Sequence, residues 1–256
     1  MSDSPLKVWR DRGGKLLRLR LARPKANICD AAMIAALQAA LDEAAADRHL
    51  MGVLLDHEGP HFSFGASVQE HMPDQCARML KSLHALVLRM VTYPVPIMVA
   101  VRGQCLGGGL EIAMAGNLMY VSPDARLGQP EIQIGVFAPA ASCLMPERMP
   151  QVQAEDLLYS GRSITGEEAA RHGLANTVAD DPEAAALAWF DGTVVKHSAS
   201  TLRYAVQAAR ADFVERVKAR IAFVETLYLS GLMSTRDAVE GLVAFVEKRP
   251  ANWEDC

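Results

Sequence analysis

The sequence of 256 residues has none of the cysteine pairings that mark disulfide frameworks or zinc sites. The five cysteines stand at positions 29, 76, 105, 143 and 256, and no two of them form a CxxC pair. An odd number of widely spaced cysteines argues against both a disulfide framework and a cysteine zinc site. We therefore expect reduced thiols and a cytoplasmic protein.

The sequence also has no excess of charge of one sign. Lys and Arg number 26 and Asp and Glu number 30, which gives a formal net charge of −4, and no basic tract is present. Binding to nucleic acid or to an anionic membrane needs such an excess, so neither is an expected partner. A local basic pocket for a phosphorylated ligand remains open.

Long hydrophobic runs are missing as well. The longest uncharged stretch after residue 124, residues 132–146, contains two prolines, a glycine and a glutamine, so we expect no membrane span. The first 21 residues carry charges throughout and do not resemble a signal peptide.

What the sequence does contain is typical of a globular protein. Half of the residues are hydrophobic and 22% are charged. The length predicts one large domain or a domain with an appendage.

Hydrophobic periodicity predicts alternating strands and helices in the first part of the chain. Leucines 17, 19 and 21 alternate with Arg18 and Arg20, which indicates a strand with one face in solvent. Residues 52–56 and 96–101 read as buried strands, and helices are expected from Asp30 to about residue 46 and after Asp74. This strand-strand-helix rhythm predicts a layered α/β fold.

The strand pattern disappears after about residue 182. Residues 201–228 have helical spacing, and residues 234–237 fit a capping box that opens a last helix to about residue 248. We predict a catalytic core over residues 1–190 and a helical region over residues 191–256. The apolar stripes of these helices suit either covering the chain's own sheet or packing against another subunit.

Two motifs are misleading. Residues 57–61 match the letters of the zinc-protease pattern HExxH, but Gly59 and Pro60 between the histidines exclude the helix that this pattern requires. The glycine-rich residues 103–109 are neither a dinucleotide-binding fingerprint nor a phosphate loop, and no GxSxG motif supplies a serine nucleophile. No metal site is expected.

Two isolated carboxylates carry the functional hypothesis. Glu111 is the only charged residue in 103–123, and Glu131 is the only one in 129–146. Buried carboxylates suit acid/base chemistry, although each could equally be a helix N-terminal group or an arginine partner. The glycines 107–109 before a helix, and a second bare turn at residues 64–67, could provide backbone N–H donors for an enolate oxygen.

At these residues the sequence resembles the crotonase (enoyl-CoA hydratase/isomerase) superfamily over essentially the whole chain. The matching segments, in the family's order, are residues 23–27, 61–67, 103–111, 127–131, 161–169 and 245–249. The resemblance implies a core built as a spiral of ββα repeats with a helical C-terminal trimerisation region. It also implies a homotrimer or a dimer of trimers.

The resemblance also implies roles for individual residues. It places the oxyanion-binding N–H groups on Ala66 and Gly108 and the two catalytic carboxylates on Glu111 and Glu131. A coenzyme A thioester would lie against six further residues, Lys25, Ala26, Ser67, Val68, Gln69 and Lys248, with Arg249 an alternative to Lys248. Coenzyme A would be part of the substrate, and no separate cofactor is implied.

Two departures from the family pattern concern the acyl group. Ser67 stands where the family commonly has Asp, and residues 135–143 replace the usual Pro-Gly-x-Gly-Gly stretch. These segments resemble members that hydrate cyclohexa-1,5-diene-1-carbonyl-CoA by 1,4-addition of water, giving 6-hydroxycyclohex-1-ene-1-carbonyl-CoA in anaerobic benzoyl-CoA degradation. The alternatives are a general enoyl-CoA hydratase or isomerase, and a non-catalytic member that binds RNA or a protein.

Overall fold

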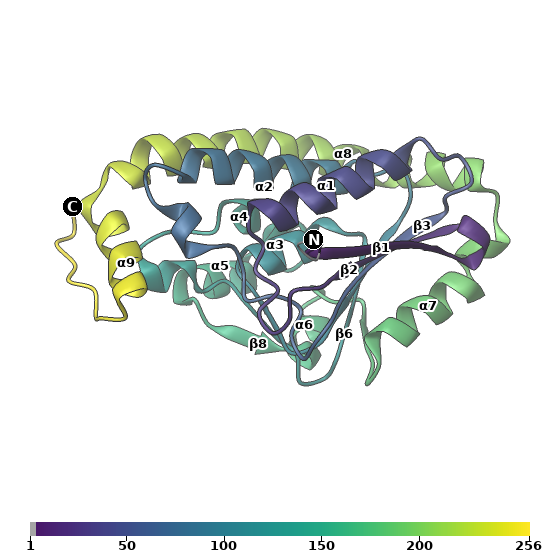
Figure 1. Cartoon of the computed structure of the whole chain (residues 1–256), viewed down its shortest axis with the longest axis horizontal. Coiled ribbons are helices and arrows are strands. Elements are labelled where there is room, and N and C mark those ends of the chain that lie inside the picture. Colours follow the sequence, from purple (N-terminus) through teal and green to yellow (C-terminus); the bar gives the residue numbers. More distant parts are fainter. Residues whose placement is uncertain (1–3) are drawn as a thin grey trace.

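The computed structural model describes residues 4–256 as two β-sheets surrounded by helices (Figure 1). The larger sheet has six strands in the order β1-β2-β3-β4-β6-β9. Their bounds are β1 Leu6–Asp11, β2 Leu16–Leu21, β3 Gly52–His57, β4 Ile97–Val101, β6 Leu118–Val121 and β9 Thr177–Val178. Only β1 and β2 pair antiparallel, and the remaining neighbours are parallel.

Helices cover the two faces of this sheet. On one face α1 (Ala31–Ala45) packs against β2, whose Leu17 and Leu19 belong to the same core, and α2 (Cys76–Val91) packs against α1. On the other face α7 (Pro182–Gly192) places Phe190 against residues such as Leu16 and Tyr120. Parallel strands need apolar residues on both faces because both are covered by helices. The predicted layered α/β architecture is confirmed.

One predicted feature of β2 is wrong. The alternation of leucine with arginine indicated a face in solvent, but Arg18 is 4% exposed. It is buried because its guanidinium donates to Asp56 Oδ2 at 2.6 Å, and it also pairs with Glu183 at the start of α7. An arginine can be buried when carboxylates neutralise it, and the periodicity of a single strand contains no information on such partners.

A second sheet and several short helices lie beside the end of β4. The sheet has the order β5-β7-β8, with β5 Gln104–Leu106, β7 Arg126–Gly128 and β8 Ser163–Thr165. The helices of this region are α3 Gly108–Ala115, α4 Pro139–Leu144, α5 Gln151–Ser160 and α6 Gly166–Arg171. The short helical turns are η1 Arg12–Gly14, η2 Val68–His71, η3 Pro130–Ile134, η4 Met145–Glu147 and η5 Val194–Lys196.

The C-terminal part of the chain is helical, as the sequence predicts. The long helix α8 (Ala199–Thr226) runs along α2, continues into the π-helical turn η6 (Leu227–Gly231) and the short turn η7 (Leu232–Ser234), and leads to α9 (Arg236–Glu247) near the C-terminus (Figure 1). The division at residue 190 stays a prediction, and α7 runs across it.

Two predicted helix starts need correction. The last helix is capped by Thr235, whose hydroxyl accepts from the N–H of Ala238, and not by a box that begins at Ser234. Helix α2 begins after Gln75, and Asp74 does not cap it. By contrast, Asp30 caps α1 as predicted, accepting from the N–H of Met33 at 2.9 Å.

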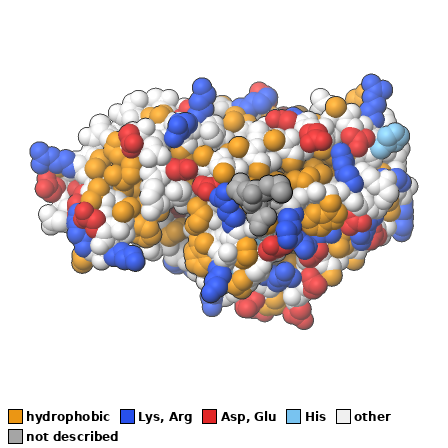
Figure 2. All heavy atoms as spheres, in the orientation of Figure 1, with side chains coloured by type: hydrophobic (Ala, Val, Ile, Leu, Met, Phe, Trp, Pro, Cys, Tyr) orange, Lys and Arg blue, Asp and Glu red, His pale blue; other side chains and the backbone are white. Residues whose placement is uncertain are grey.

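The surface mixes charges of both signs with small groups of hydrophobic side chains over the face seen in Figure 2. Between residues 4 and 256, no helix combines the length and apolar character needed to cross a membrane.

Candidate active site

The turn before α3 brings two loops of the chain into close contact. Gly107 has a positive φ of 50°, a conformation that favours glycine. Its N–H donates to Gly128 O at 3.0 Å. A Cβ on Gly109 would lie 2.5 Å from Cβ of Ser63, so only glycine lets the residues 103–109 approach the loop at residues 61–67 this closely.

The two predicted oxyanion donors lie side by side. A Cβ built on Gly108 would be 3.2 Å from the backbone nitrogen of Ala66. Gly65, with a φ of 106°, makes the turn that brings Ala66 there. Within residues 4–256 neither N–H donates a hydrogen bond to another group. Two adjacent free backbone donors, one at the N-terminus of a helix, are suited to hold an oxyanion.

Buried polar side chains hold the first of these loops in place. The Ser63 hydroxyl donates to Asn27 O at 2.8 Å and accepts from the N–H of Gly65 at 3.1 Å. The Asn27 amide donates to the carbonyls of Glu58 and His61 at 3.0 and 2.9 Å. The loop at 23–27, which the resemblance assigns to coenzyme A, is therefore rigidly joined to the loop that carries Ala66.

Glu111 lies on α3, one turn after the glycines, and is 2% exposed. Its Oε1 accepts a hydrogen bond from the backbone N–H of Ala141, in the first turn of α4, at 2.8 Å. Burial raises the pKa of Glu111, while this N–H and the nearby His84 favour the ionised form.

Glu131 stands in η3, directly after β7, and reaches the turn before α3. Its Oε1 lies 2.5 Å from the position that a Cβ on Gly107 would occupy. With its amide oriented to satisfy its hydrogen bonds, the buried Gln129 donates to Oε1 and Oε2 of Glu131 at 3.2 and 3.1 Å. Burial and the charge of Glu111 raise the pKa of Glu131 to about 8.

The two carboxyl groups are thus brought together and placed in different environments. Each raises the other's cost of ionisation because like charges repel in a poorly solvated site. Glu111 accepts the backbone N–H of Ala141, whereas burial and the charge of Glu111 favour the proton on Glu131 even with the Gln129 amide beside it. The arrangement can take a proton with one carboxylate and supply a proton from the other carboxyl.

Sequence reasoning missed five residues around these carboxylates. They are Gln129, Ala141, Tyr228, and His84 with its partner Glu225, whose Nδ1 and Oε2 atoms lie 2.7 Å apart. Gln129 falls within the family segment at residues 127–131, where a buried amide next to Glu131 could have been suspected. His84 lies among the apolar residues of α2, and Tyr228 lies in the turn η6 that follows α8. At both places the sequence pattern indicates only packing.

The residues expected to contact coenzyme A lie around the same loops. Val68 and Gln69 form η2 after Ser67, and α9 packs against η2, which brings the element preceding Lys248 beside them. The Ser67 hydroxyl donates to Gln69 Oε1 at 3.3 Å. The exposed Lys25 and Lys248 form no ion pair within residues 4–256.

The alternative cation Arg249 is already engaged. Its guanidinium donates to both carboxylate oxygens of Glu240, at 2.6 and 2.8 Å, and to Glu247 at 2.6 Å. Of the two candidates, Lys248 is the one with a charge available for a phosphate.

The histidines of the HExxH look-alike have structural roles. His57 Nε2 accepts from the N–H of Arg102 at 3.2 Å, and His61 Nδ1 accepts from the N–H of Gln104 at 3.1 Å. Burial lowers the pKa of His57 to about 4. Among residues 4–256 no group of three or more His, Cys, Asp or Glu side chains is placed to hold a metal ion.

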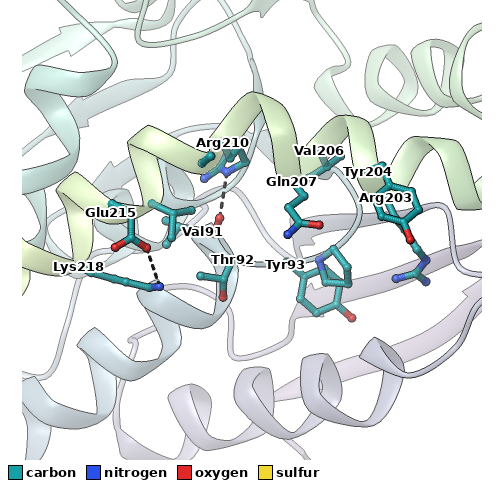
Figure 3. Close-up of a pocket in the computed structure, with 13 residues that line it drawn as sticks. Val91, Thr92, Tyr93, Arg203, Tyr204, Val206, Gln207, Arg210, Glu215 and Lys218 are labelled. Atoms are coloured by element: carbon teal, nitrogen blue, oxygen red, sulfur yellow. Dashed lines mark hydrogen bonds and ion pairs between the residues drawn. The ribbon is translucent and has the colours of Figure 1, made fainter.

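A cavity of about 450 Å³ lies elsewhere, between α8 and the residues that follow α2 (Figure 3). Its charged side chains are engaged: Arg210 donates to Val91 O at 3.0 Å, and Lys218 pairs with Glu215 at 3.1 Å. The cavity does not include either catalytic candidate.

Comparison with known proteins agrees with this geometry. The family model "Enoyl-CoA hydratase/isomerase" matches residues 11–256. The chain is 66% identical over 254 residues to a cyclohexa-1,5-dienecarbonyl-CoA hydratase of Thauera aromatica, covering 99% of this chain and 98% of that protein. It is 33% identical to a putative enoyl-CoA hydratase of Thermus thermophilus, with 85% and 88% of the two chains covered.

Solved structures of this family share the fold. An enoyl-CoA hydratase from Mycobacterium avium superposes with a TM-score of 0.86 at 25% identity, over 98% of this chain and 99% of the other. An enoyl-CoA hydratase from Bacillus halodurans gives a TM-score of 0.86 at 19% identity, over 94% and 100%. From its sequence and its fold, the chain belongs to the enoyl-CoA hydratase/isomerase family.

Proposed function

We propose that this protein is a hydro-lyase that adds water to cyclohexa-1,5-diene-1-carbonyl-CoA and forms 6-hydroxycyclohex-1-ene-1-carbonyl-CoA. The observation that carries this proposal is the 66% identity, over nearly all of both chains, to a hydratase named for that diene. The pairing of Glu111 and Glu131 beside two free backbone donors supplies the chemistry that such a reaction needs.

The thioester carbonyl is the activating group in this mechanism. Its oxygen is held by the N–H groups of Ala66 and Gly108, which stabilise the negative charge that develops there. Because these donors are fixed before the substrate arrives, they need no rearrangement in the transition state. The carbon β to the carbonyl becomes electrophilic as a result.

Water is activated by Glu111. Its carboxylate removes a proton from a water molecule, and the oxygen attacks the β carbon of the ring, C2. The electrons move through C1 into the thioester and form an enolate that is conjugated with the remaining C5=C6 double bond. The N–H of Ala141 favours the ionised form of Glu111 against the effect of burial, and a general base must be ionised to act.

Glu131 supplies the proton that reaches the ring, and the proton that Glu111 took from water must then pass to Glu131 to restore both carboxyl groups for the next turnover. With its pKa raised to about 8, this carboxyl holds a proton at neutral pH and delivers it to C5, the far end of the diene. The double bond then lies between C1 and C6, so the addition is 1,4 overall. When the ring is renumbered so that the new double bond joins C1 and C2, the carbon that carries the hydroxyl becomes C6. The product is therefore the 6-hydroxy thioester.

We infer that no metal or redox cofactor takes part, since the thioester itself polarises the ring and coenzyme A belongs to the substrate. The CoA portion would lie along Lys25, Ala26, Ser67, Val68 and Gln69, with Lys248 near a phosphate. We also propose a homotrimer or a dimer of trimers in the cytoplasm. Large exposed hydrophobic side chains of the C-terminal region, including Phe223, Phe245 and Trp253, support association.

The direct test compares two substrates. Purified protein is incubated with cyclohexa-1,5-diene-1-carbonyl-CoA and, separately, with crotonyl-CoA, and the products are followed by mass and retention time. We expect a gain of one water on the diene and little reaction of crotonyl-CoA. Rapid hydration of crotonyl-CoA with an untouched diene would instead identify a general enoyl-CoA hydratase.

The proposed oligomeric state and location are tested separately from the reaction. Light scattering on the purified protein should give three or six times the mass of 27.7 kDa. Activity should remain in the supernatant when cell membranes are sedimented. A monomeric mass would contradict the proposed assembly without affecting the proposed reaction.

A further inference from the structure

Tyr228 is a buried tyrosine whose hydroxyl has no hydrogen-bond partner. The residue is 0% exposed, and its Oη contacts no donor or acceptor within residues 4–256. The buried Tyr93, by comparison, donates from its hydroxyl to Leu41 O at 3.0 Å. A buried tyrosine normally has such a partner, and leaving the group unpaired costs stability.

The backbone around Tyr228 is also unusual. It lies in η6, where the α-helical hydrogen bonds of α8 give way to a π-helical turn over Leu227–Gly231. Single π-helical turns are rare and occur frequently at functional sites, where they change the direction of one or two side chains. An unpaired hydroxyl in such a turn calls for an explanation by function.

The surroundings of the Tyr228 ring belong to the active site. Phe137 packs against it edge to face, with ring centroids 5.3 Å apart and an interplanar angle of 62°. Phe137 lies in the segment that runs from Glu131 to Ala141, the donor to Glu111. Burial raises the pKa of Tyr228, and the acidic groups of Cys76, Glu131 and Glu111 nearby oppose its ionisation further, so the phenol keeps a proton to donate.

The depth of Tyr228 does not separate it from the substrate. Glu111 itself is only 2% exposed. An acyl group that reaches this carboxylate must therefore enter the same enclosed region, and the segment bearing Phe137 and Ala141 borders both side chains.

We propose that the Tyr228 hydroxyl donates a hydrogen bond to the oxygen atom that is added to the ring, first in the attacking water and then in the product hydroxyl. This inference rests on the proposed function and assigns a specificity-determining residue for it. Glu111 would take one proton of the water. The Tyr228 O–H would donate to one lone pair of the water oxygen, which leaves the other lone pair to attack the ring. The product hydroxyl would then give the phenol the partner that it lacks within the chain.

The first test measures binding of two ring thioesters. The ligands are 6-hydroxycyclohex-1-ene-1-carbonyl-CoA and cyclohex-1-ene-1-carbonyl-CoA, which lacks the hydroxyl, and Glu111→Gln protein is used because its turnover is expected to be about 10²- to 10⁴-fold slower. Adding Tyr228→Phe should weaken binding of the hydroxylated ligand about five- to twenty-fold, the effect of one lost hydrogen bond, and leave the other ligand unchanged. Tyr93→Phe in the same background is the matched control and should change neither.

The second test separates this role from a structural one. Tyr228→Phe removes an unpaired buried hydroxyl, so its melting temperature should equal or exceed that of the wild type, whereas Tyr93→Phe should melt lower. In otherwise wild-type protein, Tyr228→Phe should lower kcat for the diene about ten-fold. A clear loss of melting temperature in Tyr228→Phe would indicate a structural hydrogen bond and contradict the proposal.

The experiments distinguish a failure of the proposed function from a failure of the proposed role of Tyr228. If the wild type does not hydrate the diene, the proposed function is wrong. If the wild type is active but Tyr228→Phe binds both ligands as before, only the role of Tyr228 is wrong. Equal weakening of both ligands would likewise contradict it, because the effect would then come from the shape of the pocket.

Discussion

The backbone N–H of Ala141 donates a hydrogen bond of 2.8 Å to Oε1 of Glu111, thirty residues earlier in the chain. The bond joins α3 to α4 and is made by a main-chain donor, which no side-chain substitution at residue 141 other than proline removes. It stabilises the ionised carboxylate in a site where burial opposes ionisation. The fold therefore supplies the proposed base with one donor that offsets part of the effect of burial on its pKa.

Glu111→Gln should abolish most of the hydration activity and preserve the fold. The amide oxygen still accepts from Ala141, but an amide cannot remove a proton from water. We expect kcat for the diene to fall about 10²- to 10⁴-fold. Melting temperature should stay equal or rise, because an uncharged amide avoids the cost of burying a carboxylate. Activity within a factor of three of wild type would contradict the assignment of the base.

Activity should fall as the pH rises through about 8, because Glu131 must carry a proton to act as the acid and its pKa is raised to about 8. The profile of kcat/KM for the diene between pH 6 and 10 measures this fall in activity. Glu131→Gln should lower hydration about 10²- to 10⁴-fold at every pH. Unchanged hydration in this variant would contradict a mechanism with two carboxyl groups.

The same pKa shift predicts a pH dependence of stability. The pKa of Glu131 in the folded protein lies above its ordinary value of 4.5, so its stabilising contribution is complete below pH 4.5 and is lost as the pH rises through about 8. Glu131→Gln should therefore melt close to wild type at pH 5 and above it at pH 9. Thermal unfolding of both proteins at the two pH values checks this. The same difference in melting temperature at pH 5 and at pH 9 would show that the carboxyl is not buried as described.

Gly107→Ala should damage both stability and activity. The added methyl group would lie 2.5 Å from Oε1 of Glu131, and the positive φ at this position disfavours a side chain. We expect a loss of about 1–3 kcal/mol in the free energy of unfolding and a large fall in kcat. Gly192→Ala is the control, since a Cβ there meets no atom within 4 Å. It should leave kcat unchanged.

Asp56→Asn tests the charge cluster that β2 shares with α7. Asp56 is 2% exposed and accepts from Arg18 at 2.6 Å and from Arg20 at 2.6 and 2.8 Å. Removing its charge leaves buried arginine insufficiently neutralised, so unfolding in denaturant should show a loss of about 3–5 kcal/mol. Lys218→Gln breaks an exposed pair with Glu215 and should cost at most about 1 kcal/mol.

Lys248→Ala should weaken coenzyme A binding and spare the chemistry. We expect KM for the diene thioester to rise a few-fold with kcat unchanged, and the effect should shrink at high salt. Lys196→Ala, on η5, removes another exposed cation and is the control. If both variants behave alike, Lys248 makes no specific contact with the phosphates.

Much of the local structure follows from the sequence alone. Alternating leucines identify β2, the buried strands predicted at residues 52–56 and 96–101 are observed as β3 and β4, and Asp30 caps α1. These features depend on neighbours a few residues away, such as a cap or a strand's two faces. The isolation of Glu111 and Glu131 in apolar stretches is likewise a property of the sequence, and it identifies the candidate carboxylates.

Only the tertiary structure decides which partners these residues meet. The burial of Arg18 depends on Asp56 and Glu183, and the state of Glu111 depends on Ala141. The unpaired hydroxyl of Tyr228 is equally invisible in a helical pattern. Each such environment is made by segments far apart in the chain, and neither the periodicity nor the capping pattern of one segment contains its long-range neighbours. Sequence therefore determined the elements and the reactive groups, while packing determined their charge, their protonation and their accessibility.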